Sequence, residues 1–364
     1  MKIFVAGASG VLGRQLVPLL ANAGHEIVGT TTSPQKLETL RTLGAQPVVL
    51  DLLDAEAVGR AISEAEPEVV VHEATALSGI GGNFRKIDET FAQTNRLRTE
   101  GTDNLLAAAL AVGTRKLVAQ SYAGWTFARE GAAVKDEDSA LDSAPASNAK
   151  ETMAAIRYLE ERVVAAKEID GIVLRYGGFY GPGTSFAEDG ESVKAIRKRA
   201  FPIVGGGGGM ASFIHIEDAA RATFAAIERG LRGIYNIVDD EPAPVSAWLP
   251  FAANVVGAKP PRHVPFWLGK LFAGEMLATM MVEGRGASNA KAKRELDWQP
   301  FYPSWREGFV NGLKSAAYAA RSPLPVDIGK ALPRVAYGEW WVPLEIPLLR
   351  ERPSRQTPSV EAWR

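Results

Sequence analysis

The chain has no cysteine and only four histidines among its 364 residues. Without cysteine it cannot form disulfides, carry out thiol catalysis or hold an iron–sulfur cluster or a cysteine zinc site. The histidines at positions 25, 72, 215 and 263 lack the i, i+4 pairing and the neighbouring carboxylates of a zinc-binding helix. We therefore predict no metal site, and we interpret His72 and His215, which lie in apolar surroundings, as core histidines.

The chain also lacks an excess of charge and a long apolar run. Its 41 basic residues balance 42 acidic ones, which gives no basic surface of the kind that nucleic-acid-binding proteins carry. The apolar stretch at residues 1–13 is broken by glycines and is too short for a signal peptide or a membrane helix. These absences predict a cytoplasmic protein with no nucleic-acid partner and no membrane partner.

A glycine-rich turn is present near the start of the chain. Residues 2–31, KIFVAGASGVLGRQLVPLLANAGHEIVGTT, have the pattern of a strand, a glycine loop, a helix and a second strand. The first glycine of such a loop makes the tight turn, the second admits a pyrophosphate to the main-chain amides, and the third permits close helix packing. We therefore predict that a dinucleotide binds here, with contacts from Gly7, Ser9, Gly10, Val11, Leu12 and Gly13.

The end of the second strand bears on the choice of cofactor. An acidic residue at this position selects the free 2′-hydroxyl of NAD, but here the strand ends in Thr30, Thr31, Thr32 and Ser33. Hydroxyl groups tolerate a 2′-phosphate, and Lys36 lies close enough in sequence to assist. We therefore favour NADP over NAD, with Thr30, Thr32 and Ser33 as contacts, although a polar loop that accepts both cofactors fits the same residues.

Strands and helices then continue to alternate. QPVVLDLLD, PEVVVHEATAL and RKLVAQSYAGW read as strands that leave polar residues at their ends, namely Asp51, Thr75, Ser121 and Tyr122. Alternation of this kind predicts an α/β fold with a doubly wound parallel sheet of the Rossmann type. Ligands of such sheets bind at the carboxyl ends of the strands, where these polar residues fall.

With these motifs in place, the chain resembles the extended short-chain dehydrogenase/reductase superfamily, in particular its epimerase/dehydratase branch. The resemblance covers about residues 1–318 and rests on GASGVLG, DLLD, VVHEAT, GTDNLLAAA, VLRYGGFYGPG, FIHIEDAARA and NAKAKRELDWQP. It implies that Asp51 contacts the adenine and that other residues contact the cofactor along its length, namely Leu52, Ala74, Thr75, Ala76, Asn95, Arg175, Tyr176 and Gly177.

The resemblance also implies the division of the chain. We predict a Rossmann domain over residues 1–178, to which residues 205–240 return. Residues 179–204 and 241–318 would form a smaller, mostly helical substrate lobe. A proline-rich extension, with Trp340 and Trp341, would follow at 319–364 and pack on the body or on a partner subunit.

The superfamily's catalytic tyrosine and the lysine four residues later are missing. Their places are taken by Met153 and Arg157. Methionine cannot transfer a proton, and the guanidinium of arginine stays charged. An alignment shifted along the helix would instead nominate Tyr158 with Arg162, on a different helix face.

A different acid is therefore needed for carbonyl reduction. We predict Tyr122, preceded by Ser121, with the pKa of its phenol lowered by Arg157 or Lys150. Tyr122 could equally be a pocket wall, and Tyr176 and Tyr180 are weaker alternatives.

The apolar composition of residues 240–287 favours a hydrophobic or modest-sized substrate over a nucleoside diphosphate. The apolar helix after Gly101 could support a homodimer. The sequence thus predicts an NAD(P)-dependent enzyme that transfers hydride at a hydroxyl or carbonyl carbon. The alternatives are a non-redox isomerase or dehydratase of the same fold, or a non-catalytic dinucleotide sensor.

Overall fold

The computed structural model describes residues 1–77 and 84–314. The predicted extension at 319–364, with Trp340 and Trp341, lies outside the described residues. Within the described residues, no helix is both long enough and apolar enough to cross a bilayer.

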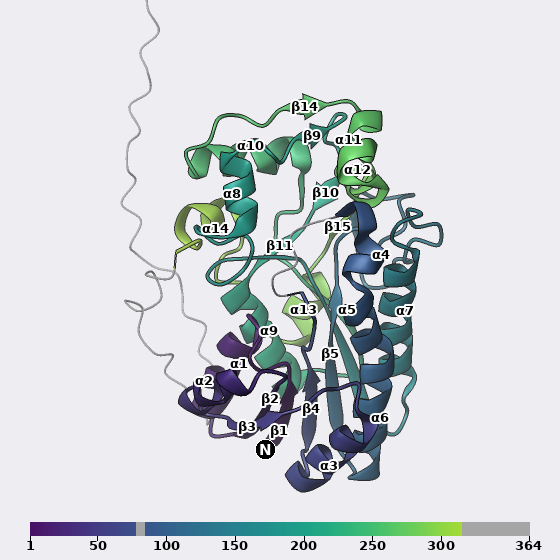
Figure 1. The fold of residues 1–364 in the computed structure, drawn as a ribbon, viewed down its shortest axis with the longest axis vertical. Coiled ribbons are helices and arrows are strands. Elements are labelled where there is room, and N and C mark those ends of the chain that lie inside the picture. Colours follow the sequence, from purple (N-terminus) through teal and green to yellow (C-terminus); the bar gives the residue numbers. More distant parts are fainter. Residues whose placement is uncertain (78–83, 315–364) are drawn as a thin grey trace, which may run out of the picture. The chain divides into compact units, whose positions relative to one another are not determined.

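A seven-stranded parallel sheet lies at the centre of the described residues (Figure 1). Its strand order is β12-β7-β5-β4-β1-β2-β3. The order reverses next to β1, as in a doubly wound sheet, so the predicted fold class is confirmed. The strands are β1 (Lys2–Ala6), β2 (Glu26–Thr31), β3 (Gln46–Val49), β4 (Val69–His72), β5 (Lys116–Tyr122), β7 (Asp170–Tyr176) and β12 (Gly233–Ile237).

Helices cover both faces of this sheet. One face packs against α1 (Gly13–Asn22), α2 (Leu37–Thr42) and α9 (Ile216–Arg229). The other face packs against α3 (Ala55–Ala65), α6 (Thr102–Ala111) and α7 (Lys150–Ala165). Because both faces are covered, the strands read as apolar runs rather than as alternating patterns.

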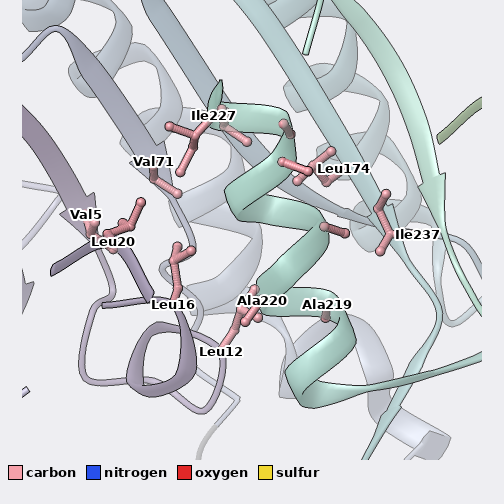
Figure 2. Packing of buried hydrophobic residues seen from close by; sticks show 14 of the residues in the cluster. Val5, Leu12, Leu16, Leu20, Val71, Leu174, Ala219, Ala220, Ile227 and Ile237 are labelled. Atoms are coloured by element: carbon pink, nitrogen blue, oxygen red, sulfur yellow. The ribbon is translucent and has the colours of Figure 1, made fainter. Parts of the chain in front are cut away.

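The first face shows how the sequence builds this core. Leu12, Leu16 and Leu20 recur at helical spacing along α1 and are buried against α9 and the sheet (Figure 2). Small residues on α9, Ala219 and Ala220, allow the two helices to approach closely. Each fully buried leucine contributes about 1.5–3 kcal/mol to the free energy of unfolding, and this packing fixes the helix that follows the glycine turn.

Short helices connect β4 to α6. They are α4 (Ile87–Thr90), α5 (Ala92–Arg96) and a π-helical turn, η3 (Leu97–Gly101), which runs directly into α6. Single π-turns inside helices are uncommon and often lie near functional sites.

A second lobe caps the carboxyl ends of the strands (Figure 1). Its helices are α8 (Glu191–Arg197), α10 (Val245–Val255), α11 (Phe266–Ala273), α12 (Glu275–Glu283) and α14 (Trp305–Asn311). They share one apolar cluster that includes Trp248, Trp305 and Phe309. Trp248, Trp305 and Phe309 therefore build a core, whereas Phe266, Trp267 and Phe272 of α11 are exposed.

Four short strand pairs link the lobe to itself and to the sheet domain. They are β8 (Gly178–Tyr180) with β11 (Phe213–His215), β9 (Ile203–Val204) with β14 (His263–Val264), β10 (Met210–Ala211) with β13 (Ala243–Pro244), and β6 (Val134–Lys135) with β15 (Gly286–Ala287). The helix α13 (Ala290–Glu295) packs beside β12. The pair β10–β13 lies between residues 205 and 244, and the predicted return of residues 205–240 to the sheet domain stays a prediction.

Candidate functional site

The glycine turn lies between the ends of β1 and β4. Gly7 has a φ of +87°, which favours glycine, and a Cβ at this position would lie 2.7 Å from the main-chain N and Cα of Ala74. The amide of Gly7 donates to Oγ1 of Thr30 over 3.2 Å, and the amide of Gly10 donates to the carbonyl of Gly7 over 2.9 Å. A side chain at residue 7 would therefore push apart the two strand ends that frame the turn.

The first turn of α1 suits an anion. Gly13 lets the helix approach the loop, because a Cβ there would lie 2.4 Å from the carbonyl oxygen of Ala8. Among the described residues no side chain caps this helix, and its first turn has no acidic residue. Free amides at a helix N-terminus attract phosphate, so the main chain around Val11 and Leu12 fits a dinucleotide pyrophosphate.

The end of β2 is rich in hydroxyl groups, and two of them hydrogen-bond to the glycine turn. Thr30 and Thr31 are buried and brace the glycine turn, since Oγ of Ser9 donates to Oγ1 of Thr31 over 2.9 Å. Thr30 therefore lies under the loop, where its hydroxyl accepts from the amide of Gly7, and its contact with a cofactor stays a prediction. Thr32 and Lys36 are exposed beyond it, and Ser33 donates to Gln35.

Other predicted cofactor contacts follow the carboxyl ends of β3 and β4. Asp51 is exposed and accepts from the amide of Leu53, while the carbonyl of Leu52 accepts from Asn104. The amide of Ala76 donates to Oγ1 of Thr94 over 3.1 Å, which ties the loop after β4 to α5.

Tyr122 ends β5 at the same edge of the sheet. Its ring lies against Gly124, where a Cβ would fall 2.2–2.6 Å from Cε1, Cζ and Oη of the ring. Burial raises the pKa of the Tyr122 phenol above the ordinary value of 10.0. The prediction that Arg157 or Lys150 lowers this pKa is therefore wrong, because removal of the phenol from water outweighs any effect of a cation.

The start of α7 explains why these cations do not act on Tyr122. Met153 is fully buried, and the Arg157 guanidinium donates to the main-chain oxygen of Asp142. Lys150 is exposed at the first position of the helix. The alternative pair, Tyr158 and Arg162, lies on an exposed face, where both side chains bind Asp103 of α6.

Ser121 and Arg175 meet beneath α7 rather than at the reacting edge. Oγ of Ser121 donates to Oε1 of Glu160 over 2.6 Å, and Arg175 binds the same carboxylate through two hydrogen bonds of 2.8 and 2.6 Å. All three residues are buried. Arg175 and Glu160 therefore form a buried ion pair that joins α7 to β7, and Ser121 of β5 donates to it. Contact of Ser121 or Arg175 with a substrate or cofactor stays a prediction.

The remaining candidate tyrosines and His215 are buried in the core. Tyr176 is 1% exposed, and burial raises the pKa of its phenol, as it does for Tyr180. His215 binds the carbonyl of Gly312 and the amide of Glu217 through its two ring nitrogens, as expected of a core histidine. Gly177 donates its amide to Ile237 and fits closely against Ser212.

Two polar groups near this edge are absent from the sequence prediction. Asp88 accepts from the amides of Glu151 and Thr152 and from the Thr152 hydroxyl, so it caps α7 from another helix. Asn95 donates to the same hydroxyl over 3.1 Å, and its Oδ1 is buried without a partner among the described residues. No local pattern reveals this cap, because Asp88 lies more than 60 positions before the helix that it caps.

Glu73 is the second such group. Its carboxyl is buried beside the glycine turn, where Oε1 accepts from the Tyr176 hydroxyl over 3.1 Å and Oε2 has no partner in the described part of the chain. The Tyr176 hydroxyl also contacts Thr223. Burial raises the pKa of Glu73 from 4.5 to about 8, so this carboxyl is neutral at neutral pH.

This pKa predicts a pH-dependent stability. Between pH 4.5 and about 8 the folded chain keeps a proton on Glu73 that the unfolded chain releases, so its contribution to stability is lost as pH rises through this window. Relative to Glu73→Gln, the wild-type free energy of unfolding should fall by on the order of 2–4 kcal/mol across that range. Urea unfolding of both proteins at several pH values measures this, and parallel curves would contradict it.

A small apolar groove lies between the loop after β5 and α12. Trp125 and Phe127 line it from the loop after β5, and Met276 and Met280 line it from α12. Arg129 and Asp142 lie at its wall. Within residues 1–77 and 84–314, no cluster of three or more histidine or acidic side chains could hold a metal ion. The glycine turn thus provides a place for a dinucleotide pyrophosphate, whereas the space in this groove, about 20 Å³, holds about one water molecule and no organic substrate.

The chain is similar to several known proteins. Residues 3–238 match the profile of the NAD dependent epimerase/dehydratase family. A 3-diazoavenalumate denitrifying reductase from a Streptomyces species is 43% identical over 309 residues, which cover 85% of this chain and 99% of that protein. A ketoreductase of a farnesyl dihydroquinoline oxide from Stigmatella aurantiaca is 27% identical over 289 residues, 78% of this chain and 82% of that protein.

A solved structure shares the fold. The UDP-glucose 4-epimerase of Thermotoga maritima superposes with a TM-score of 0.67 at 22% identity, covering 86% of this chain and 97% of that one. The chain therefore belongs to the NAD dependent epimerase/dehydratase family, and it is an enzyme of the oxidoreductase and epimerase type that uses a nicotinamide cofactor.

Proposed function

We propose that the chain is an NADPH-dependent reductase that removes the nitrogen of a diazo-bearing carboxylate. The support from similarity is the 43% identity to a denitrifying reductase over 99% of that protein's length. The support from chemistry, and the observation that carries the proposal, is Tyr122, whose phenol has a pKa raised by burial.

Because its pKa is raised, this phenol stays protonated at neutral pH, so the form present in the site is a proton donor. Oxidation of an alcohol needs a base to remove the hydroxyl proton, and bases work best when their pKa is near the operating pH. The pKa of Tyr122 is above 10.0 and thus far from neutral pH. Met153 and Arg157 occupy the places of the tyrosine and lysine that would supply a base. The protonated phenol is therefore in the state from which reduction begins, whereas oxidation would begin from the phenolate.

Reduction of a diazo group needs a hydride and a proton donor but no base, so it suits this site. A bound reduced nicotinamide would supply the hydride that replaces dinitrogen on the carbon, at the expense of its own oxidation. Tyr122 would supply the proton that neutralises the remaining anion. Such an anion is strongly basic, so a phenol with a raised pKa is acidic enough to protonate it. Release of dinitrogen makes the reaction irreversible, and no base is required.

The choice of NADPH rests on the end of β2. Between Glu26 and Glu38 there is no acidic residue to repel a 2′-phosphate, and the exposed Thr32 and Lys36 and the half-buried Ser33 offer donors to it. With Thr30 turned under the loop, we propose Thr32, Ser33 and Lys36 as the phosphate contacts. Comparison of NADPH and NADH affinities, with Lys36→Gln as the variant, tests this choice.

Ketone reduction is the second candidate, because a ketoreductase aligns with 78% of this chain. It would use the same hydride and the same phenol. The two activities are separated by their products. A diazo substrate labelled with ¹⁵N should give one labelled dinitrogen for each NADPH oxidised, measured by mass spectrometry of the gas. Oxidation of NADPH by ketones with no dinitrogen from any diazo carboxylate would favour the second candidate.

We further propose a homodimer that forms through α6 and α7, where Leu110 and Tyr158 are exposed. Light scattering coupled to gel filtration tests it: a mass near twice that of the chain supports the dimer, and a single-chain mass excludes it. Location in the cytoplasm also stays a prediction.

A further inference from the structure

An open cavity of about 460 Å³ lies beside α11, the helix that Figure 1 shows next to α12. Its walls come from three segments that are far apart in the sequence, namely Arg85, residues 147–148 and residues 267–275. Small-molecule sites usually have volumes of roughly 300–1,000 Å³. This cavity is therefore large enough to hold an organic ligand.

Asn148 joins the three walls. Its Nδ2 donates to the carbonyl of Phe84 over 2.9 Å, and its Oδ1 accepts from the amide of Met276 over 3.1 Å. Gly274, between α11 and α12, has a φ of +92°, and a Cβ there would lie 2.6 Å from the carbonyl oxygen of Phe84. Because main-chain atoms make these contacts, the cavity is already formed before a ligand arrives.

The ionisable groups of the cavity leave one cation unpaired. Nζ of Lys270 lies 2.7 Å from Oε1 of Glu275, and the amide and hydroxyl of Ser147 donate to Oε2 of the same carboxylate. These hydrogen bonds lower the pKa of Glu275 from 4.5 to about 2, so it stays ionised and offsets the charge of Lys270. The Arg85 guanidinium is exposed and, in the described part of the chain, has no carboxylate within 4.0 Å.

The helix α11 gives the cavity an apolar surface. Trp267 and Leu271 line it and are four residues apart, so they project from the same side of the helix. They are 67% and 54% exposed. An aromatic ring that packs on the exposed indole removes apolar surface from water on both partners and gains from ring stacking. The cavity thus combines an unpaired guanidinium with an uncovered aromatic side chain.

We propose that this cavity binds an aromatic carboxylate, with its acid group on Arg85 and its ring on Trp267. A guanidinium can bind a carboxylate through two parallel hydrogen bonds. The acid group goes to Arg85 rather than to Lys270, because Lys270 is paired with Glu275, whose charge repels a second carboxylate. The inference goes beyond the proposed function, and neither depends on the other.

The test measures binding without turnover. The probe is trans-cinnamate, with cinnamamide as the neutral counterpart of the same shape, titrated calorimetrically into the full chain. Arg85→Gln should weaken cinnamate binding by about fivefold to thirtyfold, because a charge-assisted contact is lost. The affinity for cinnamamide should change less than about twofold, because this ligand has no charge. Trp267→Ala should weaken the binding of both ligands by about threefold to tenfold, because both lose the same stacking surface.

The chain offers a matched control for each variant. Lys86→Gln removes a positive charge at the adjacent position, where Lys86 pairs with Glu89 and does not line the cavity. Phe272→Ala removes an aromatic side chain of α11 that is 68% exposed and also does not line the cavity. Neither control should change either affinity by more than about twofold. Retained NADP⁺ affinity in each variant shows that the protein is folded.

Three results would overturn the inference. The first is that cinnamate does not bind to the wild type. The second is that Arg85→Gln weakens cinnamate and cinnamamide equally, or that Lys86→Gln weakens cinnamate as much as Arg85→Gln does, since the attraction would then not be specific to Arg85. The third is that Trp267→Ala binds both ligands as tightly as the wild type. Measurement of dinitrogen release tests the proposed function separately from all of these.

Discussion

Tyr122→Phe is expected to slow substrate reduction by about 10²–10⁴-fold, the usual contribution of a positioned general acid. The ring stays against Gly124, so the shape of the site is kept and only the proton is lost. The dissociation constant for NADPH should stay within about twofold, because the glycine turn is untouched. Stopped-flow measurement of NADPH oxidation gives the rate of reduction, and a fluorescence titration gives the dissociation constant for NADPH.

A second variant checks that position matters as well as chemistry. In Gly124→Ala the new Cβ would overlap the Tyr122 ring at distances of 2.2–2.6 Å, which displaces the phenol without removing it. Gly124→Ala should slow turnover about as much as Tyr122→Phe does. The double variant Tyr122→Phe/Gly124→Ala should be no slower than Tyr122→Phe alone, because both substitutions remove the same proton transfer. Full activity of Tyr122→Phe would eliminate this residue as the proton donor.

Gly7→Ala should weaken NADPH binding by at least about a hundredfold, roughly 3 kcal/mol. The φ of +87° is unfavourable for alanine, and the added Cβ would lie 2.7 Å from the main chain of Ala74. Because the overlap is with backbone, the loop must move away from β4 and lose the amide geometry that holds the pyrophosphate.

Gly24→Ala is the matched control. Gly24 has a similar φ of +81°, but an added Cβ would meet no atom within 4 Å. It should cost about 1–2 kcal/mol of stability and leave the NADPH affinity unchanged. If both variants bind NADPH equally well while remaining folded by circular dichroism, the glycine turn is not the pyrophosphate site.

The fold could be predicted because its signals are local. The alternation of apolar strands with amphipathic helices can be recognised from consecutive residues. The spacing of Leu12, Leu16 and Leu20 indicates the buried face of α1 even when their contacts are not known. The roles of Gly7 and Gly13 follow equally directly, since a sharp turn and a close helix contact each need a missing side chain.

The electrostatics of the site could not be predicted in this way. The sequence places Arg157 and Lys150 on the helix beside Tyr122, but the pKa of the phenol depends on how much water and protein surround it, which only the folded chain determines. In the same way, Ser121 sits one position before Tyr122, yet the alternation of a strand turns its hydroxyl to Glu160 beneath the opposite helix. A glutamate is usually exposed, and nothing in the local sequence indicates that the fold buries Glu73.

Transfer of deuterium from NADPH labelled at the transferring position of C4 tests the central claim most directly. The account predicts that the product carries the deuterium on the carbon that held nitrogen, that the reaction in unlabelled water adds no second deuterium, and that Tyr122→Phe slows this transfer without changing its destination. A denitrified product free of deuterium would contradict the account, because the nitrogen would then leave without hydride from the cofactor.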